Sequence, residues 1–142
     1  MPSQIGLMGV GLMGENLALN IESKGFAVSV FDVSTAKVDQ FVAARGQGKQ
    51  IVGCHSVNGL VASLERPRKV MLMVPAGHPV DESIEILTGF LERGDIIIDG
   101  GNSHFPDTIR RTKYVESKGL LFIGTGVSGG EAVSGLCRFA GD

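Results

Sequence analysis

The chain has 142 residues, 43% of them hydrophobic and 20% charged, a size and composition that suit one hydrophobic core and therefore a single domain. Its formal net charge of −2 gives no overall field that would attract nucleic acid or an anionic membrane, so we expect neither as a partner. The 21 glycines follow no three-residue period, which excludes a collagen-like chain, so their excess needs a local structural reason.

Short apolar runs recur along the chain and indicate strands. They are Ile5–Met8, Ala27–Phe31, Val70–Val74, Ile96–Ile98 and Leu120–Ile123. Continuous apolar runs of this length are typical of strands buried on both faces, and such strands pair in parallel.

The segments between these runs carry apolar residues at helical spacing. The stripes are Met13, Leu17 and Ile21; Val38, Phe41 and Val42; Val57, Leu60, Val61 and Leu64; and Val80, Ile84, Leu87 and Leu91. Pro79 and Pro106 suit the first turns of two helices. Because strand and helix alternate through the whole chain, we predict an α/β fold of Rossmann type, with a doubly wound, mainly parallel sheet and helices on both faces.

A cation followed by glycine marks the expected end of four helical segments. These pairs are Lys24-Gly25, Arg45-Gly46, Arg93-Gly94 and Lys118-Gly119. A cation in the last turn meets the negative end of the helix dipole, and glycine takes the left-handed conformation that closes a helix. We therefore expect left-handed glycines at all four positions.

The first strand is followed directly by Gly9-Val10-Gly11-Leu12-Met13-Gly14, which opens the first helix. Gly9 permits a tight turn, Gly11 lets the backbone approach a pyrophosphate, and Gly14, with Ala18 one turn on, lets the helix lie close to the sheet. The N–H groups of the first helical turn then face the phosphates. Two other interpretations are a glycine-rich turn without a ligand and a methyltransferase cofactor site. The spacing to the third glycine disfavours the methyltransferase.

A carboxylate follows where a ribose-binding acid is expected. Asp32 ends the second strand, 32 − 11 = 21 positions after the middle glycine, close to the ~20 typical of dinucleotide-binding domains. There it would accept hydrogen bonds from the adenosine ribose and repel a 2′-phosphate. The alternative is that Asp32 caps the helix that starts near Ser34, although Ser34 can cap that helix by itself.

Three segments make the similarity to a known family specific. They are Gly9–Ile21, Gly94–Ser103 and Gly126–Glu131. Together they resemble the N-terminal coenzyme domain of 6-phosphogluconate dehydrogenase, from about residue 4 to residue 131. The Asp-Gly-Gly-Asn-Ser sequence at 99–103 is the most diagnostic part, since the wider β-hydroxyacid dehydrogenase family usually lacks it.

The resemblance implies an oxidoreductase of the pentose phosphate pathway and of gluconate utilization. Members of the family oxidise C3 of 6-phosphogluconate, a sugar acid phosphate, by hydride transfer to NAD(P). The resulting β-keto acid loses carbon dioxide and gives ribulose 5-phosphate. The resemblance also implies a cytoplasmic protein whose full length forms a homodimer or a larger homo-oligomer.

The same resemblance implies roles for residues of three loops. Asn102 would hold the reacting hydroxyl and the nicotinamide carboxamide together, Val74-Pro75-Ala76 would lie beside the nicotinamide ribose, and Ser128, Gly129 and Gly130 would bind the carboxylate end of the substrate. Residue chemistry agrees, because Asn102 follows the carboxyl end of a strand and offers both a donor and an acceptor. Successive backbone N–H groups at 128–130 can bind an anion.

Two departures from the family pattern favour NAD over NADP. The commoner NADP-dependent members carry Asn-Arg-Thr where this chain has Asp32-Val33-Ser34, so the arginine that would pair with a 2′-phosphate is missing. Pro75 replaces the usual lysine after Val74, as in the shorter, NAD-preferring branch. NADP stays the alternative coenzyme, because Lys37 can reach a phosphate.

Residues 1–142 are interpreted as one dinucleotide-binding domain, with no assignment for 132–142, which depart from the family pattern. We expect the family's C-terminal all-α domain to be absent, and with it the general-base lysine, a glutamic acid and the arginines for the substrate phosphate. We therefore expect this chain to bind a dinucleotide coenzyme but not to catalyse turnover. The alternatives are a β-hydroxyacid dehydrogenase of the 3-hydroxyisobutyrate type, which Gly100-Gly101-Asn102 disfavours, and a stand-alone dinucleotide-binding module.

Histidine and cysteine predict no metal site. His55, His78 and His104 are too far apart in sequence to argue for a metal, and we expect surface or loop roles for them. Cys54 and Cys137 have neither disulfide nor metal-ligand spacing, and suit a reducing compartment.

We assign no functional site to the basic cluster at residues 110–113 or to the first residues of the chain. We expect Arg110, Arg111 and Lys113 to form a solvated helix face rather than a phosphate site. The first residues carry no basic segment typical of a signal peptide, and no apolar run is long enough to span a membrane.

Overall fold

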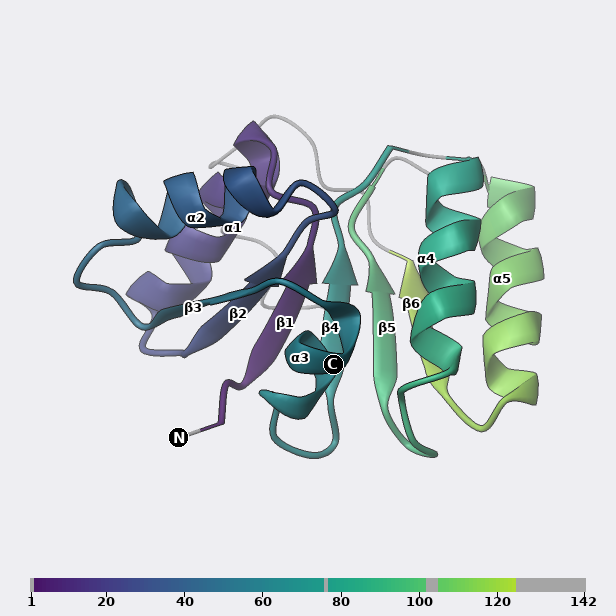
Figure 1. Ribbon diagram of the computed structural model, residues 1–142. Helices are drawn as coiled ribbons and strands as arrows, with labels where there is room; N and C mark the ends of the chain where they lie inside the picture. The colour runs from purple at the N-terminus through teal and green to yellow at the C-terminus, as the bar shows by residue number, and fades with distance from the viewer. Residues whose placement is uncertain (1, 76, 102–104, 125–142) are drawn as a thin grey trace.

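A computed structural model describes residues 2–75, 77–101 and 105–124, and the strands of these ranges form one parallel sheet (Figure 1). The strands are β1 Ile5–Met8, β2 Val28–Phe31, β3 Ile51–Cys54, β4 Lys69–Leu72, β5 Ile96–Asp99 and β6 Leu121–Gly124. Their order across the sheet is β3-β2-β1-β4-β5-β6, and every neighbouring pair is parallel. The order reverses between β1 and β4, and ligands of open α/β sheets bind beyond the carboxyl ends of the strands at such a point.

Helices cover both faces of the sheet. They are α1 Leu12–Ser23, α2 Thr35–Ala43, α3 Val57–Ala62, α4 His78–Thr88 and α5 Phe105–Ser117. Successive residues of a strand point to opposite faces, so Leu7 packs in one apolar cluster with α1 and α2, while Met8 packs in a second cluster with α3, α4 and α5. The predicted doubly wound α/β fold of Rossmann type is confirmed (Figure 1).

Strand β3 is missing from the sequence prediction. It lies at the edge of the sheet and pairs only with β2, and of its four residues only Ile51 and Cys54 are buried. Val52 is 44% exposed and Gly53 has no side chain, so no continuous apolar run marks the strand. A Cβ at Gly53 would lie 3.0 Å from methyl groups of Val38 and Val42, so the glycine lets α2 pack closely on this edge.

Several predicted element ends differ from the structure. Gly25 and Gly119 follow α1 and α5 with positive φ, as expected. The prediction for Gly46 is wrong, because the positive φ after α2 falls at Gly48 instead. Gly94 has positive φ, but α4 already ends at Thr88, so Gly94 shapes a turn before β5 and caps no helix. Apolar spacing continues past the end of α4 because buried Leu91 packs in the same core from the turn.

The described ranges were searched for membrane-spanning helices and for metal sites. No helix there is both long enough and apolar enough to cross a membrane. Within the same residues, no three His, Cys, Asp or Glu side chains come together as a metal site.

Candidate functional site

The turn between β1 and α1 is shaped by two glycines that have no room for a side chain. A Cβ on Gly9 would lie closer than 3.0 Å to the carbonyl oxygen of Met73, and its φ of +109° is one that other residues rarely adopt. A Cβ on Gly14 would meet the carbonyl oxygen of Gly9 equally closely. The turn, the start of α1 and the chain after β4 are therefore packed backbone to backbone.

Gly11 has the opposite environment. It is the N-cap of α1, and a Cβ there would meet nothing within 4 Å. The N–H groups of a first helical turn have no acceptor within the helix, and no side chain of the described residues caps this one. Open space over Gly11, next to these N–H groups and the positive end of the helix dipole, suits a phosphate group.

Asp32 holds the glycine turn and the β2–α2 turn together. Its Oδ2 accepts a hydrogen bond from the backbone N–H of Val10 at 2.8 Å, and its Oδ1 accepts one from Ser34 at 2.9 Å. The cap of α2 is Ser34, whose Oγ accepts from the N–H of Lys37, so the interpretation of Asp32 as the helix cap is wrong. A carboxylate has about four acceptor positions, so positions remain for ribose hydroxyls.

Two apolar side chains of the predicted site are strongly exposed. Leu12 is 73% exposed at the start of α1, and Val33 is 91% exposed immediately after Asp32. Apolar side chains with this exposure offer surface that a bound ring can cover. Lys37 is exposed in the first turn of α2, so a cation also lies on this side of the site.

The chain segments after β4 and β5 meet at the same edge of the sheet. The N–H of Gly100 donates to the carbonyl of Leu72 at 2.9 Å, and a Cβ on Gly100 would lie 2.6 Å from Sδ of Met73. Met73 is also the residue that contacts Gly9. The structure thus brings together the glycine turn, the segment before Val74 and Pro75, and the double glycine at 100–101.

Part of the predicted site lies outside the described residues. Ala76, Asn102, Ser128, Gly129 and Gly130 belong to this part, so their roles stay predictions. His104 and Cys137 also lie outside it.

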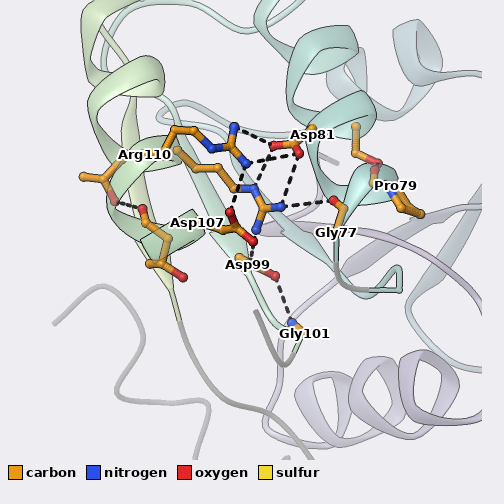
Figure 2. A network of polar contacts seen from close by, with 11 residues as sticks. Gly77, Pro79, Asp81, Asp99, Gly101, Asp107 and Arg110 are labelled. Carbon is orange, nitrogen blue, oxygen red and sulfur yellow. Dashed lines mark hydrogen bonds and ion pairs between the residues drawn. The ribbon is translucent and has the colours of Figure 1, made fainter. Parts of the chain in front are cut away.

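The basic cluster on α5 divides into exposed and buried members. Arg110 and Lys113 are exposed, as expected for a solvated face. The prediction is wrong for Arg111, which is 1% exposed and forms ion pairs with Asp81 and Asp99. Both partners are distant in sequence, on α4 and at the end of β5 (Figure 2). The only signal was spacing, since Arg111 lies four residues before buried Val115 on the same helix face.

The two arginines lower the pKa of Asp81 to about 2, mainly through the hydrogen bond that Arg111 donates. Nε of Arg111 lies 2.8 Å from Oδ1 of Asp81, and Nη1 of Arg110 lies 3.3 Å from the same oxygen. These residues line a small groove between α4 and α5 together with Glu85 and Tyr114. In this groove Asp81 is paired with both arginines, and Glu85 accepts a hydrogen bond from the hydroxyl of Tyr114.

Several titratable groups outside this cluster form pairs, among them Glu15 in the first turn of α1, which lies 2.8 Å from Arg45. His55 pairs with Asp39 at 2.7 Å and His78 with Glu82 at 3.6 Å, and all four side chains are exposed. Burial raises the pKa of the Cys54 thiol, against the weaker effect of its hydrogen bond with Ser63. These groups give no nucleophile or metal ligand set within the described ranges.

Comparison with known proteins gives one consistent family. A family model described as the NAD binding domain of 6-phosphogluconate dehydrogenase matches residues 4–135. The decarboxylating 6-phosphogluconate dehydrogenase of Dictyostelium discoideum is 61% identical over 127 residues, and that of Treponema pallidum is 56% identical over 131 residues. These matches cover 89% and 92% of this chain. The chain spans only 26% and 27% of the length of these relatives.

A solved structure of the same family also matches this chain. The 6-phosphogluconate dehydrogenase of Plasmodium falciparum, described in its apo form, with its cofactor NADP+ and with its substrate 6-phosphogluconate, matches with a TM-score of 0.85 at 40% identity. The match covers 93% of this chain and 28% of that chain. The 3-hydroxyisobutyrate dehydrogenase of Mycobacterium tuberculosis matches with a TM-score of 0.76 at 24% identity, over 93% of this chain and 43% of that chain. At that identity the likeness concerns the fold alone.

Two glycines of the turn should respond differently to the same substitution. Gly9→Ala places a Cβ against a backbone carbonyl at a strained φ, and we expect it to lower the free energy of unfolding by about 3 kcal/mol. Gly11→Ala meets open space and should change it by less than about 0.5 kcal/mol, yet weaken NAD binding by filling the phosphate approach. Urea unfolding and calorimetric titration measure both. Equal destabilisation by the two substitutions would contradict the assignment.

The ion pair of Asp81 predicts a pH-dependent stability. The folded-state pKa of about 2 is below the ordinary value of 3.8, so the carboxylate stabilises the fold above that ordinary value. This contribution is lost as the pH falls toward 2. Comparing thermal unfolding of the wild type and Asp81→Asn, we expect a constant difference in Tm above about pH 5 that shrinks below about pH 4. A difference that does not change with pH would refute the assignment.

Proposed function

Because the chain belongs to the family of 6-phosphogluconate dehydrogenase NAD-binding domains, we propose that it is the coenzyme domain of an enzyme that converts 6-phosphogluconate to ribulose 5-phosphate and carbon dioxide. The observation that carries this proposal is the meeting of three segments beyond the carboxyl ends of the strands, namely the glycine turn, Asp32 and the double glycine at 100–101. The first two provide a phosphate site and a ribose acceptor. The third begins the loop that leads to Asn102.

The described residues fit a dinucleotide. The cradle left by Gly11 and the first-turn N–H groups of α1 would hold the pyrophosphate, and the free acceptor positions of Asp32 would take the adenosine ribose. Val74, Pro75 and Ala76 would then lie along the nicotinamide half. When bound, the nicotinamide accepts a hydride from the substrate carbon.

The chain's own polar residues would orient the substrate for that transfer. Asn102 offers a donor and an acceptor to the C3 hydroxyl, and the backbone N–H groups of Ser128, Gly129 and Gly130 offer donors to the substrate carboxylate. The hydroxyl proton must pass to a base as the hydride leaves, and the β-keto acid then loses carbon dioxide. In the family that base is a lysine of the all-α domain, so a longer protein would combine both domains.

The proposal includes NAD as the preferred coenzyme. Both oxygens of Asp32 are fixed by backbone N–H groups, so the carboxylate cannot swing away from a 2′-phosphate. Two unit charges ~4 Å apart at an effective dielectric constant near 20 repel by about 4 kcal/mol before solvent screening. Val33 supplies no compensating cation, and Lys37 is the one cation of the first turn of α2 that argues for NADP.

The greater length of the relatives supports the proposal that residues 1–142 act as one coenzyme domain of a longer polypeptide. As the family resemblance implies, we propose that this polypeptide is cytoplasmic, binds a sugar acid phosphate and assembles as a homodimer or a larger homo-oligomer. The coenzyme site needs only this chain, so it can be tested first.

Coenzyme choice tests the role of Asp32. Calorimetric titration of the chain should give binding about tenfold tighter for NAD than for NADP. The double variant Asp32→Asn, Val33→Arg should reverse this order, because it removes the repelling charge and adds a cation at an exposed position. Asn keeps an acceptor for a turn N–H, so the fold is retained. Tighter binding of NADP by the wild type would overturn the preference.

Turnover tests the domain assignment. The chain mixed with 6-phosphogluconate and either coenzyme should give no absorbance at the wavelength of reduced nicotinamide, because oxidation of an alcohol needs a positioned base. As a positive control, adding the all-α domain of a relative should give turnover. Sustained turnover by the chain alone would refute the assignment to a coenzyme domain.

A further inference from the structure

We propose that Arg111 is a positioning residue that fixes the loops after β4 and β5 relative to each other and thereby sets the geometry of the nicotinamide half of the site. The inference rests on the proposed function, because it needs a dinucleotide bound at the glycine turn. Asp32 and the glycine turn would hold the adenosine and pyrophosphate on the β1–β2 side. The other half of the ligand must therefore extend over β4 and β5, which lie on the opposite side of the switch point.

The Arg111 guanidinium faces three groups around these loops, and Asp81 contacts two of its nitrogens, since Nη2 also donates to Oδ2 of Asp81 at 3.4 Å. Nε lies 2.8 Å from Oδ1 of Asp81, and Nη2 donates to the carbonyl oxygen of Gly77 at 3.0 Å. Nη1 lies 3.8 Å from Oδ2 of Asp99. Figure 2 labels the three partners Gly77, Asp81 and Asp99 and marks the polar contacts of this network with dashed lines. Because the fork is planar and rigid, it fixes three positions at once, which an ammonium group cannot do.

Asp99 transmits this position to the loop after β5. Its Oδ1 accepts the N–H of Gly101 at 3.0 Å while Oδ2 faces Arg111. On the other side of the same loop, Gly100 packs against Met73 with no space for a Cβ. Gly100 and Gly101 are thus held between β4 and the Asp99–Arg111 pair.

Gly77 connects the loop after β4 to the same guanidinium. It is the N-cap of α4 and has a φ of +95°, in which its carbonyl oxygen accepts from Arg111. Asp81, in the first turn of α4, is held by the same guanidinium. One buried cation therefore connects the start of α4 with the end of β5.

Burial distinguishes Arg111 from its neighbour. Arg111 and Asp99 are each 1% exposed, and a buried ion pair is costly to desolvate and often replaceable by apolar groups without loss of stability. Stability alone is thus a weak reason for a charge at this position. Arg110 contacts the same Asp81 but its side chain is 57% exposed, so it provides a matched control.

The test compares two ligands that share the adenosine half. NADH carries the nicotinamide and its ribose, whereas ADP ends at the pyrophosphate, so ADP reports on the glycine turn and Asp32 alone. For Arg111→Lys we expect NADH affinity to fall about tenfold, with ADP affinity changed by less than about twofold. Asp99→Asn, which keeps an acceptor for Gly101, should give the same selective loss, and Arg110→Lys should change neither affinity.

The outcomes separate this inference from the proposed function. If the wild type binds neither ligand, the proposed function fails. If the wild type binds both and the Arg111 and Asp99 variants weaken both equally or neither, the positioning role fails.

A measurement on the wild type covers the case in which the variants do not fold. The Nε–H resonance of Arg111 in a ¹⁵N spectrum should shift on addition of NADH and not on addition of ADP. The same response to both ligands, or no response to either, would overturn the inference.

Discussion

No side chain fits at Gly9 and Gly14, where the chain passes from the first strand into the first helix, and the rest of the site is arranged around that contact. A Cβ at Gly14 would collide with the carbonyl of Gly9, and one at Gly9 would collide with the carbonyl of Met73. Helix α1 can therefore begin directly at the end of β1, beside the chain leaving β4. The same approach leaves Gly11 facing open space at the helix N-terminus. Close packing at two glycines and open space at the third together give the shape that the proposed phosphate site requires.

The two halves of the sheet use the same arrangement to hold their loops. At the end of β2, Asp32 accepts the N–H of Ser34, two residues on, and its second oxygen holds Val10 of the neighbouring turn. At the end of β5, Asp99 accepts the N–H of Gly101, also two residues on, and its second oxygen faces Arg111. In each case one oxygen closes a local turn and the other ties it to a different element. The difference is accessibility, because Asp32 is half-buried whereas Asp99 is 1% exposed. Only Asp32 can contact a ligand directly.

Sequence patterns predicted the features that depend on local chemistry. A site at residues 9–14 and Asp32 could be predicted, because the glycine spacing and the distance to the acid follow from one βαβ unit. Strand β3 could not, since its stability comes from pairing with β2 and packing under α2 and not from its own composition. Arg111 was misjudged for a related reason. Its environment is set by Asp81, 30 positions away, and by Asp99, and no local pattern reports such partners.

Backbone amide shifts of ¹⁵N-labelled chain on titration with NAD test the central claim most directly, because they report the ligand's location without any substitution. We expect the largest changes at Gly9–Gly14 and Asp32–Ser34, with smaller ones at Met73, Val74 and Gly101 on the nicotinamide side. Changes confined to the groove between α4 and α5, or none at saturating NAD, would contradict a dinucleotide site at the glycine turn.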